Sequence, residues 1–219
     1  ADDVAELAMG YITIGLRRVI PYMREMRANE PALKPWARSL FRRTVGVVSA
    51  SQVGQRVMRL LKPYNIRLLI FDPFLSEERA RELGGELADL ETMARECEVV
   101  TIHAPKLPET YHMWNEKHFK LMRDDAIFVN TSRGDNIDEA ALIAELQKGR
   151  LFAFLDVTSP EPPVPESPLR ELPNVVLTPH VAGLQSYRVG EMAVEELRRC
   201  FAGEDQLFRV TRDMLDRLA

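Results

Sequence analysis

The stretch "TVGVVSASQVG", residues 44–54, runs from a short apolar segment straight into the start of a helical pattern. A strand that turns at once into a helix is the place of the dinucleotide fingerprint G-x-G-x-x-G. Here Ser49 and Ser51 stand at the first two glycine positions, and only Gly54 keeps its glycine. The stretch therefore predicts either a dinucleotide site with serines in its turn or a plain strand–helix turn.

The start of this helix can still supply an anion site, because the backbone N–H groups of Gln52 and Val53 have no partner within the helix. The hydroxymethyl group of Ser51 lies where a pyrophosphate would approach a glycine backbone, a misfit that costs about 1–3 kcal/mol. We therefore expect the turn to bind NAD(H), roughly 5- to 150-fold more weakly than a glycine turn would.

A carboxylate ends the next apolar segment. Asp72 in "LLIFDP" lies 18 residues after Gly54, close to the spacing of the acid that binds the adenosine ribose. A carboxylate there accepts hydrogen bonds from the ribose hydroxyls and repels a 2′-phosphate, which favours NAD over NADP. The alternative is an aspartate that only closes a turn before Pro73.

Apolar segments and amphipathic helical patterns alternate over the rest of the chain. Helices are expected first at 4–19, with a kink or restart at Pro21, and Asp138 and Gly149 are typical of a helix start and a helix stop. The expected strands are 45–48, 67–71, 98–103, 126–130, 152–156 and 175–177, and the expected helices between them are 52–62, 76–84, 88–95, 115–121 and 139–148. This alternation predicts an α/β fold, a doubly wound parallel sheet covered by helices on both faces.

Composition narrows the class of protein. The 219 residues carry a net charge of −4, which gives no basic surface for nucleic acid. No apolar run reaches the length of a membrane span, and no signal peptide is visible. The two cysteines lack metal-ligand spacing and are typical of inert thiols in a reducing cytoplasm, so no metal is expected. Because the chain has no initiator Met, we expect it to be a piece of something longer.

Four motifs follow the later strands in order: "TIHAP" (101–105), "NTSRG" (130–134), "DVTSPEP" (156–162) and "TPHVAG" (178–183). With the serine turn they resemble the cofactor domain of the D-isomer-specific 2-hydroxyacid dehydrogenase family over nearly the whole chain. The resemblance implies a Rossmann-type fold, NAD as cofactor, and hydride transfer between nicotinamide and a D-2-hydroxy acid or its 2-oxo acid.

The resemblance also implies a catalytic trio of Arg133, Glu161 and His180. A histidine suits proton transfer to the carbonyl oxygen at neutral pH. Glu161 would orient the imidazole and favour its protonated form. The planar guanidinium of Arg133 would bind the substrate carboxylate and its carbonyl oxygen.

Further cofactor contacts follow from the same resemblance. Asp156 would approach the nicotinamide carboxamide, His103 and its two successors would border the adenosine, and Thr131 with Ser132 would lie near the nicotinamide ribose. The complete set of expected cofactor contacts is Ser51, Gln52, Val53, Gly54, Asp72, Ala104, Pro105, Thr131, Ser132, Arg133, Asp156, His180 and Gly183. The turn 49–54, Asp72, Arg133, Asp156 and His180 should line one crevice at the carboxyl ends of the strands.

The remaining histidines and tryptophans receive plainer interpretations. His112 and His118 fall on a mostly polar stretch and are expected at the solvated surface. Trp36 and Trp114 are expected to be packing or interface anchors rather than cofactor contacts.

The resemblance divides the chain into an N-terminal helix and arm (1–43), an NAD-binding domain (44–203) and a tail (204–219) that returns toward a substrate domain largely absent from the chain. It also implies a homodimer, paired through the N-terminal helix and the arm at 21–43. A non-catalytic Rossmann relative, used for dimerisation or ligand sensing, is the alternative. The serine turn and the missing domain favour that alternative, whereas the intact trio favours an enzyme.

Overall fold

Seven strands, all parallel, form one sheet in the order β3-β2-β1-β4-β5-β6-β7 in the computed structural model, which describes residues 1–28, 37–184, 187–212 and 214. The strands are β1 (Thr44–Val48), β2 (Arg67–Phe71), β3 (Glu86–Leu87), β4 (Val99–Ile102), β5 (Ile127–Asn130), β6 (Phe152–Leu155) and β7 (Val175–Leu177). The six expected strands are confirmed to within one residue at most ends. The edge strand β3 was not predicted, because it is two residues long and both residues are exposed.

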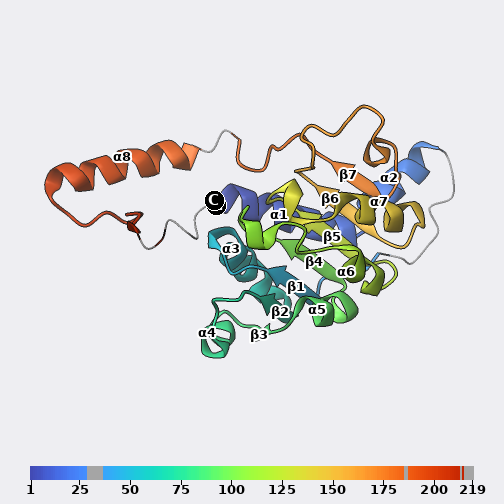
Figure 1. Ribbon diagram of the computed structural model, residues 1–219, viewed down its shortest axis with the longest axis horizontal. Helices are drawn as coiled ribbons and strands as arrows, with labels where there is room; N and C mark the ends of the chain where they lie inside the picture. The colour runs from blue at the N-terminus through green and yellow to red at the C-terminus, as the bar shows by residue number, and fades with distance from the viewer. Residues whose placement is uncertain (29–36, 185–186, 213, 215–219) are drawn as a thin grey trace.

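Helices cover both faces of the sheet (Figure 1). They are α1 (Asp2–Leu16), α2 (Val19–Arg27), α3 (Gln52–Leu61), α4 (Glu77–Glu82), α5 (Leu90–Glu96), α6 (Glu116–Leu121), α7 (Glu139–Gln147) and α8 (Tyr187–Ala202), with short 3₁₀ turns η1 (Lys62–Tyr64), η2 (Pro108–Thr110), η3 (Gly134–Asn136) and η4 (Pro168–Arg170). One hydrophobic core lies between the sheet and helices α1, α3 and α4. The other lies between the sheet and helices α5, α6 and α7. The doubly wound parallel fold is therefore confirmed.

Successive residues of a strand point to opposite faces of the sheet, so each strand contributes side chains to both cores. On β5, Ile127 and Val129 join the core under α1, while Phe128 joins the core under α6. The strands are buried on both faces, so they read as continuous apolar runs rather than as alternating ones. This explains why the central strands were easy to find and the exposed β3 was not.

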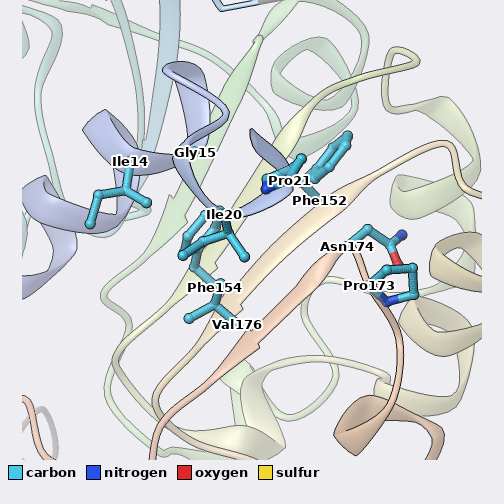
Figure 2. Close-up of a pocket in the computed structure, with 9 residues that line it drawn as sticks. All are labelled: Ile14, Gly15, Ile20, Pro21, Phe152, Phe154, Pro173, Asn174 and Val176. Carbon is cyan, nitrogen blue, oxygen red and sulfur yellow. The ribbon is translucent and has the colours of Figure 1, made fainter. Parts of the chain in front are cut away.

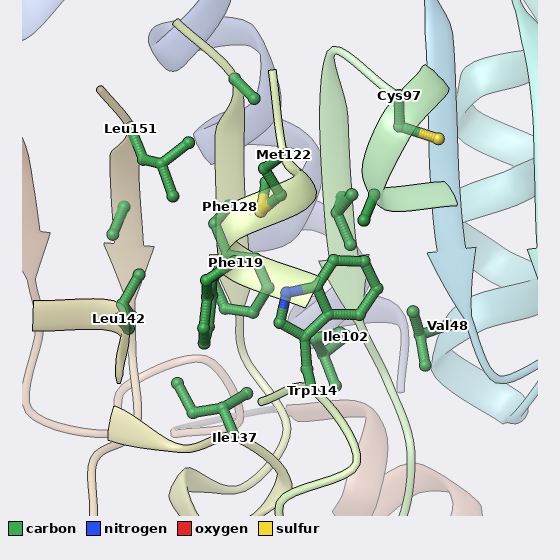
Figure 3. Close-up of a cluster of buried hydrophobic side chains, with 14 of the residues drawn as sticks. Val48, Cys97, Ile102, Trp114, Phe119, Met122, Phe128, Ile137, Leu142 and Leu151 are labelled. Carbon is green, nitrogen blue, oxygen red and sulfur yellow. The ribbon is translucent and has the colours of Figure 1, made fainter. Parts of the chain in front are cut away.

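The core beneath α6 contains an aromatic group (Figure 3). The Phe119 and Phe128 rings meet edge to face with centroids 5.0 Å apart, and Trp114 lies 5.9 Å from Phe128. Trp114 is fully buried, which confirms it as a packing residue, while Trp36 lies outside the described residues. His118 packs against Trp114 and is buried, so its expected place at the solvated surface is wrong.

The N-terminal helix breaks earlier than expected. It ends at Leu16, and Arg18 adopts a left-handed backbone with φ of 53°, after which α2 begins with Pro21 in its first turn. The break places the buried Arg18 guanidinium 3.6 Å from the centre of the Phe152 ring, where it also pairs with Asp125 at 3.1 Å. The helix therefore breaks at Arg18, and Pro21 follows the break.

A small gap remains where α1 and α2 meet β6 and β7 (Figure 2). Its volume is about 10 Å³, room for one water at most, and its lining is mainly apolar, with Ile20 and Phe154 among the residues that line it. Nothing in this gap suits a cofactor.

The last helix behaves differently from the others. In Figure 1, α8 projects away from the sheet, and it contains no buried residue. Arg188 at its start forms an ion pair with Asp2 at 3.3 Å. In the described part of the chain no helix has the length and apolar character needed to cross a membrane.

Gly54 is the position where helix and strand come closest. A Cβ atom added there would lie 2.0 Å from the carbonyl oxygen of Ser49, so only glycine allows α3 to pack on the end of β1. Gly54→Ala is expected to lower the free energy of unfolding by about 3 kcal/mol or more, measured by denaturant unfolding.

The matched control for this substitution is Gly10→Ala within α1, because a Cβ atom there meets nothing within 4 Å. It is expected to raise the free energy of unfolding by about 0.5–1 kcal/mol through helix propensity. Equal effects of the two substitutions would contradict the close packing at Gly54.

Candidate functional site

The predicted site residues lie on loops that leave the sheet at one edge. Because all strands are parallel, their carboxyl ends share that edge. Ser49 follows β1 directly, Asp72 follows β2, Thr131 follows β5 and Asp156 follows β6. The segment 178–183 follows β7 in the same way. The chain runs from β1 outward to β3 and then returns to β4 on the other side of β1. The strand order therefore reverses between β1 and β4, which is where doubly wound folds bind their ligands.

The serine turn keeps a sharp path from strand to helix. Ser49 has φ of 76°, a left-handed conformation that favours glycine. Ser51 is the N-cap of α3, and its hydroxyl accepts a hydrogen bond from the Gly54 N–H at 3.2 Å. The serine therefore occupies one of the helix-start donors, while the N–H groups of Gln52 and Val53 have no partner within the helix.

Asp72 is tied to the same turn. Its Oδ2 accepts hydrogen bonds from the Ala50 N–H at 2.9 Å and the Ser49 hydroxyl at 3.3 Å. Its Oδ1 accepts one from the Phe74 N–H at 2.9 Å. The carboxylate is half-buried and has lone pairs to spare. It can therefore support the turn and still accept a hydrogen bond from a ribose hydroxyl.

Asp156 holds the loop that carries His180. This buried carboxylate accepts hydrogen bonds from the Val181 N–H at 2.9 Å, the Ala182 N–H at 2.8 Å and the Thr178 hydroxyl at 2.5 Å. The Thr178 hydroxyl lies 2.6 Å from the phenol of Tyr11 on α1. Its three bonds make Asp156 a support for the loop, and sequence reasoning had given it only a cofactor contact.

Glu161 and His180 come together from two loops. The imidazole Nδ1 lies 2.5 Å from Glu161 Oε1, and both side chains are partly exposed. An ionised carboxylate can only accept a hydrogen bond, so Nδ1 carries the proton and donates it. This leaves Nε2 directed away from the pair and available for proton transfer. His180 has φ of 53°, and its N–H donates to the Asp156 carbonyl at 2.9 Å.

Arg133 lies on the loop after β5, with an exposed side chain. The buried Asn130 amide fixes the backbone around it, donating to the Arg133 carbonyl at 2.9 Å and accepting from the Ser132 N–H at 3.0 Å. A Cβ atom on Gly134 would lie 2.0 Å from the Thr158 carbonyl oxygen, so the two loops pack backbone to backbone. The glycine after Arg133 thus brings the arginine beside the loop of Glu161.

The other expected cofactor contacts lie on the same loops. The Ser132 hydroxyl donates to the Ala104 carbonyl, which joins the loops after β4 and β5. Thr131 is buried with no hydrogen-bond partner for its hydroxyl, Pro105 is half-buried, and Gly183 is exposed.

A hollow of about 500 Å³ opens between the segment after β4 and η3. Its lining is Lys106, Leu107, Pro108, Thr110, Tyr111, Asp135 and Asn136, none of which was predicted as a site residue. In the residues described, no group of His, Cys, Asp and Glu side chains could hold a metal ion.

Sequence reasoning missed the residues that support the trio. Tyr11, Thr178 and Asn130 carry no charge, and the motifs that contain Thr178 and Asn130 were given other functional residues, so contacts rather than residue type identify them. The exception is Asn130, whose position at the end of a strand within "NTSRG" was a usable signal, since asparagine there is typical of a side chain that closes a turn.

Comparison with known proteins agrees with this geometry. The family model of the D-isomer specific 2-hydroxyacid dehydrogenase, NAD binding domain, matches residues 9–182. Similar relatives include a D-3-phosphoglycerate dehydrogenase of Archaeoglobus fulgidus, 35% identical over 82% of this chain, and a glyoxylate reductase of Korarchaeum cryptofilum, 35% identical over 93% of this chain. This chain spans 34% of the first relative and 64% of the second.

Solved structures show the same fold. A D-lactate dehydrogenase with NAD+ from Lactobacillus jensenii superposes with a TM-score of 0.82 at 26% identity, covering 96% of this chain and 68% of that one. The apo form of a D-mandelate dehydrogenase from Rhodotorula graminis superposes with a TM-score of 0.83, also at 26% identity, covering 96% of this chain and 65% of that one.

His103, expected beside the adenosine, is buried, and its Nε2 lies 2.9 Å from the Thr101 hydroxyl. Burial lowers the pKa of His103 from 6.5 to about 3. Between these values the unfolded chain binds a proton that the folded chain does not, so stability falls as the pH drops below 6.5. We expect this histidine to contribute a loss of up to about 1.4 kcal/mol per pH unit between pH 6.5 and 5, measured by denaturant unfolding.

His103→Gln should flatten this pH dependence, while the control variant His112→Asn should keep it. His112 is the suitable control because it is half-exposed and stacks on Tyr111 at the surface. An unchanged slope in His103→Gln would show that His103 is not the group responsible.

Proposed function

We propose that this chain, which belongs to the D-isomer specific 2-hydroxyacid dehydrogenase family through its NAD-binding domain, supplies the cofactor site and the acid–base group of an NAD-dependent oxidoreductase. Its substrate is a D-2-hydroxy acid or the corresponding 2-oxo acid. The observation that carries the proposal is the His180–Glu161 pair, 2.5 Å apart, with the loop of Glu161 packed against the loop of Arg133.

NAD fits the residues at the start of α3. The helix is ten residues long and directs the N–H groups of Gln52 and Val53 out of its first turn, which suits a pyrophosphate. Asp72 would accept hydrogen bonds from the adenosine ribose. Bound NADH supplies the hydride that is delivered to the carbonyl carbon of the 2-oxo acid.

The remaining chemistry belongs to side chains of this chain. Arg133 binds the substrate carboxylate and orients the carbonyl group. His180 donates a proton from Nε2 to the carbonyl oxygen as the carbon receives its hydride, so that the alcohol forms without a free alkoxide. Glu161 stabilises the protonated imidazole and fixes its orientation through Nδ1. In the reverse direction His180 accepts the hydroxyl proton.

A non-catalytic relative is the second candidate, and one observation favours it. The Ser51 hydroxyl already takes the Gly54 N–H, so the helix start offers a phosphate fewer free donors than a glycine turn offers. Cofactor affinity distinguishes the two candidates.

We expect Ser49→Gly with Ser51→Gly to bind NADH roughly 5- to 150-fold more tightly than the unaltered chain, measured by titration with NADH fluorescence. The double change removes the hydroxymethyl group at position 51 and places glycine where φ is 76°. The control is Ser76→Gly, which alters the same kind of N-cap on α4, away from the turn. Absence of NADH binding in all forms, with the fold intact, would favour the non-catalytic relative.

Substitution of the acid–base pair tests catalysis. His180→Gln is expected to lower kcat for reduction of a 2-oxo acid by about 10²–10⁴-fold while leaving NADH affinity within a factor of a few. Glu161→Gln should lower kcat by a smaller factor, because the imidazole remains. Turnover is followed through NADH absorbance, in a protein that contains this chain together with a substrate domain. Unchanged kcat in His180→Gln would contradict the assigned role.

We also propose that the protein pairs as a homodimer through the N-terminal helix and the arm at 21–43. Val19, Met23 and Met26 on α2 are exposed, as is Phe41 near the end of the arm, and Met26 keeps 67% of its surface in solvent. An apolar surface of this kind is typical of an interface. Met26→Asp is expected to shift the sedimentation coefficient from dimer to monomer at micromolar concentration, whereas Leu60→Asp on α3 should not. A monomer before any substitution would contradict the proposal.

We propose a cytoplasmic location because the two cysteines form no disulfide. Cys97 is buried and Cys200 is exposed, and both are free, as is typical of a reducing compartment.

A further inference from the structure

Asp135 lies where the loops after β4, β5 and β6 meet. It follows Gly134 in η3, and its Oδ2 pairs with the ammonium of Lys106 on the loop after β4. Its Oδ1 accepts a hydrogen bond from the hydroxyl of Ser159, on the loop after β6, at 2.5 Å. One carboxylate thus ties together the segment that leads out of "TIHAP" and the segment that leads to Glu161.

Ser159 is held by a second acidic residue. Its N–H donates to Glu139 Oε2 at 2.9 Å, at the start of α7. Both polar groups of Ser159 are therefore directed at carboxylates of the segment that follows β5. The Thr158 carbonyl rests against Gly134, so the backbone at 158–159 is fixed from two directions.

Glu161 lies two residues beyond Ser159 and reaches His180 through a hydrogen bond of 2.5 Å. Glu161 is exposed, and among the described residues its side chain forms a hydrogen bond only with His180, so its position depends on the backbone before it. That backbone is the part that Asp135 and Glu139 hold.

We propose that Asp135, through Ser159, is a positioning residue that holds Glu161 in place to orient His180, and that Lys106 fixes Asp135 for this task. The inference rests on the proposed function only for the role of His180 in catalysis. The loop geometry itself does not depend on it.

The charge of Asp135 suits this role. The Lys106 ammonium and the Ser159 hydroxyl hold the pKa of the Asp135 carboxyl below its ordinary value, so the group is ionised at neutral pH and can only accept. A hydrogen bond to a charged acceptor is about twice as strong as one between neutral groups. A single aspartate can therefore keep both loops in register.

Nitrogen-15 NMR of the His180 ring in the full chain tests the proposal without requiring turnover. In the unaltered chain at pH 8, the neutral ring is expected to carry its proton on Nδ1, where it donates to Glu161. Asp135→Ala and Ser159→Ala should each let the Nε2–H form appear, and the two changes together should have no more effect than one. Asp135→Asn keeps an acceptor for Ser159 and should restore most of the Nδ1–H form.

Kinetics gives the second measurement. Ser159→Ala is expected to lower kcat roughly 10-fold with the KM for NADH unchanged, since misplacement of a catalytic group affects the reaction more than cofactor binding. The control Lys120→Met removes an exposed ion pair with Glu116 and should change neither measurement. If Asp135→Ala fails to fold, Ser159→Ala, which loses one hydroxyl, decides the outcome.

An unchanged His180 ring in Ser159→Ala would overturn the proposal, whether or not the protein reduces a 2-oxo acid. A changed ring with no turnover in any form would instead keep the positioning role of Asp135 and contradict the proposed catalysis.

Discussion

The parallel direction of every strand governs this protein. Parallel strands must be joined by crossovers, so a helix lies between most successive strands and the loops at the carboxyl ends gather at one edge. That edge receives the polar residues at 49–54, 72, 130–135, 156–161 and 178–180. The opposite edge receives none of the proposed site residues. Because all strands run in the same direction, the proposed site residues lie at one end of the sheet, separate from the two cores that stabilise the domain.

At that end of the sheet, the supporting side chains are buried and the side chains proposed for catalysis are exposed. Asp156 and Asn130 are almost fully buried, and each holds a backbone segment through two or more hydrogen bonds. Arg133 and His180 are exposed at the ends of those segments. The free energy that orients the exposed groups therefore comes from hydrogen bonds in the interior, where water competes least.

Sequence alone accounted for the sheet, because buried strands have a strong apolar pattern and helices such as α7 have clear caps at Asp138 and Gly149. It failed where the cause was a side-chain contact that leaves no pattern in the sequence. His118 was expected at the surface because its neighbours are polar. It is buried instead, where its ring packs on Trp114 and its Nδ1 accepts a hydrogen bond from the Asn115 N–H. The break before α2 was expected at Pro21, whereas it lies at Arg18, whose guanidinium packs on the Phe152 ring. The proposed trio was inferred from motifs, but the hydrogen bond from Ser159 to Asp135 joins residues 24 positions apart and has no local signature.

The short strand β3 has a consequence for the protein in concentrated solution. An open sheet ends in unpaired N–H and C=O groups that can recruit a strand from another molecule. Here the edge is two residues long, and the adjacent Arg67 pairs with both Glu86 and Glu96, so charged side chains crowd it. The outermost strand on the other side of the sheet, β7, has three residues. Both outermost strands are therefore short, and short or charged outer strands are typical of sheets that avoid pairing with a strand of another molecule.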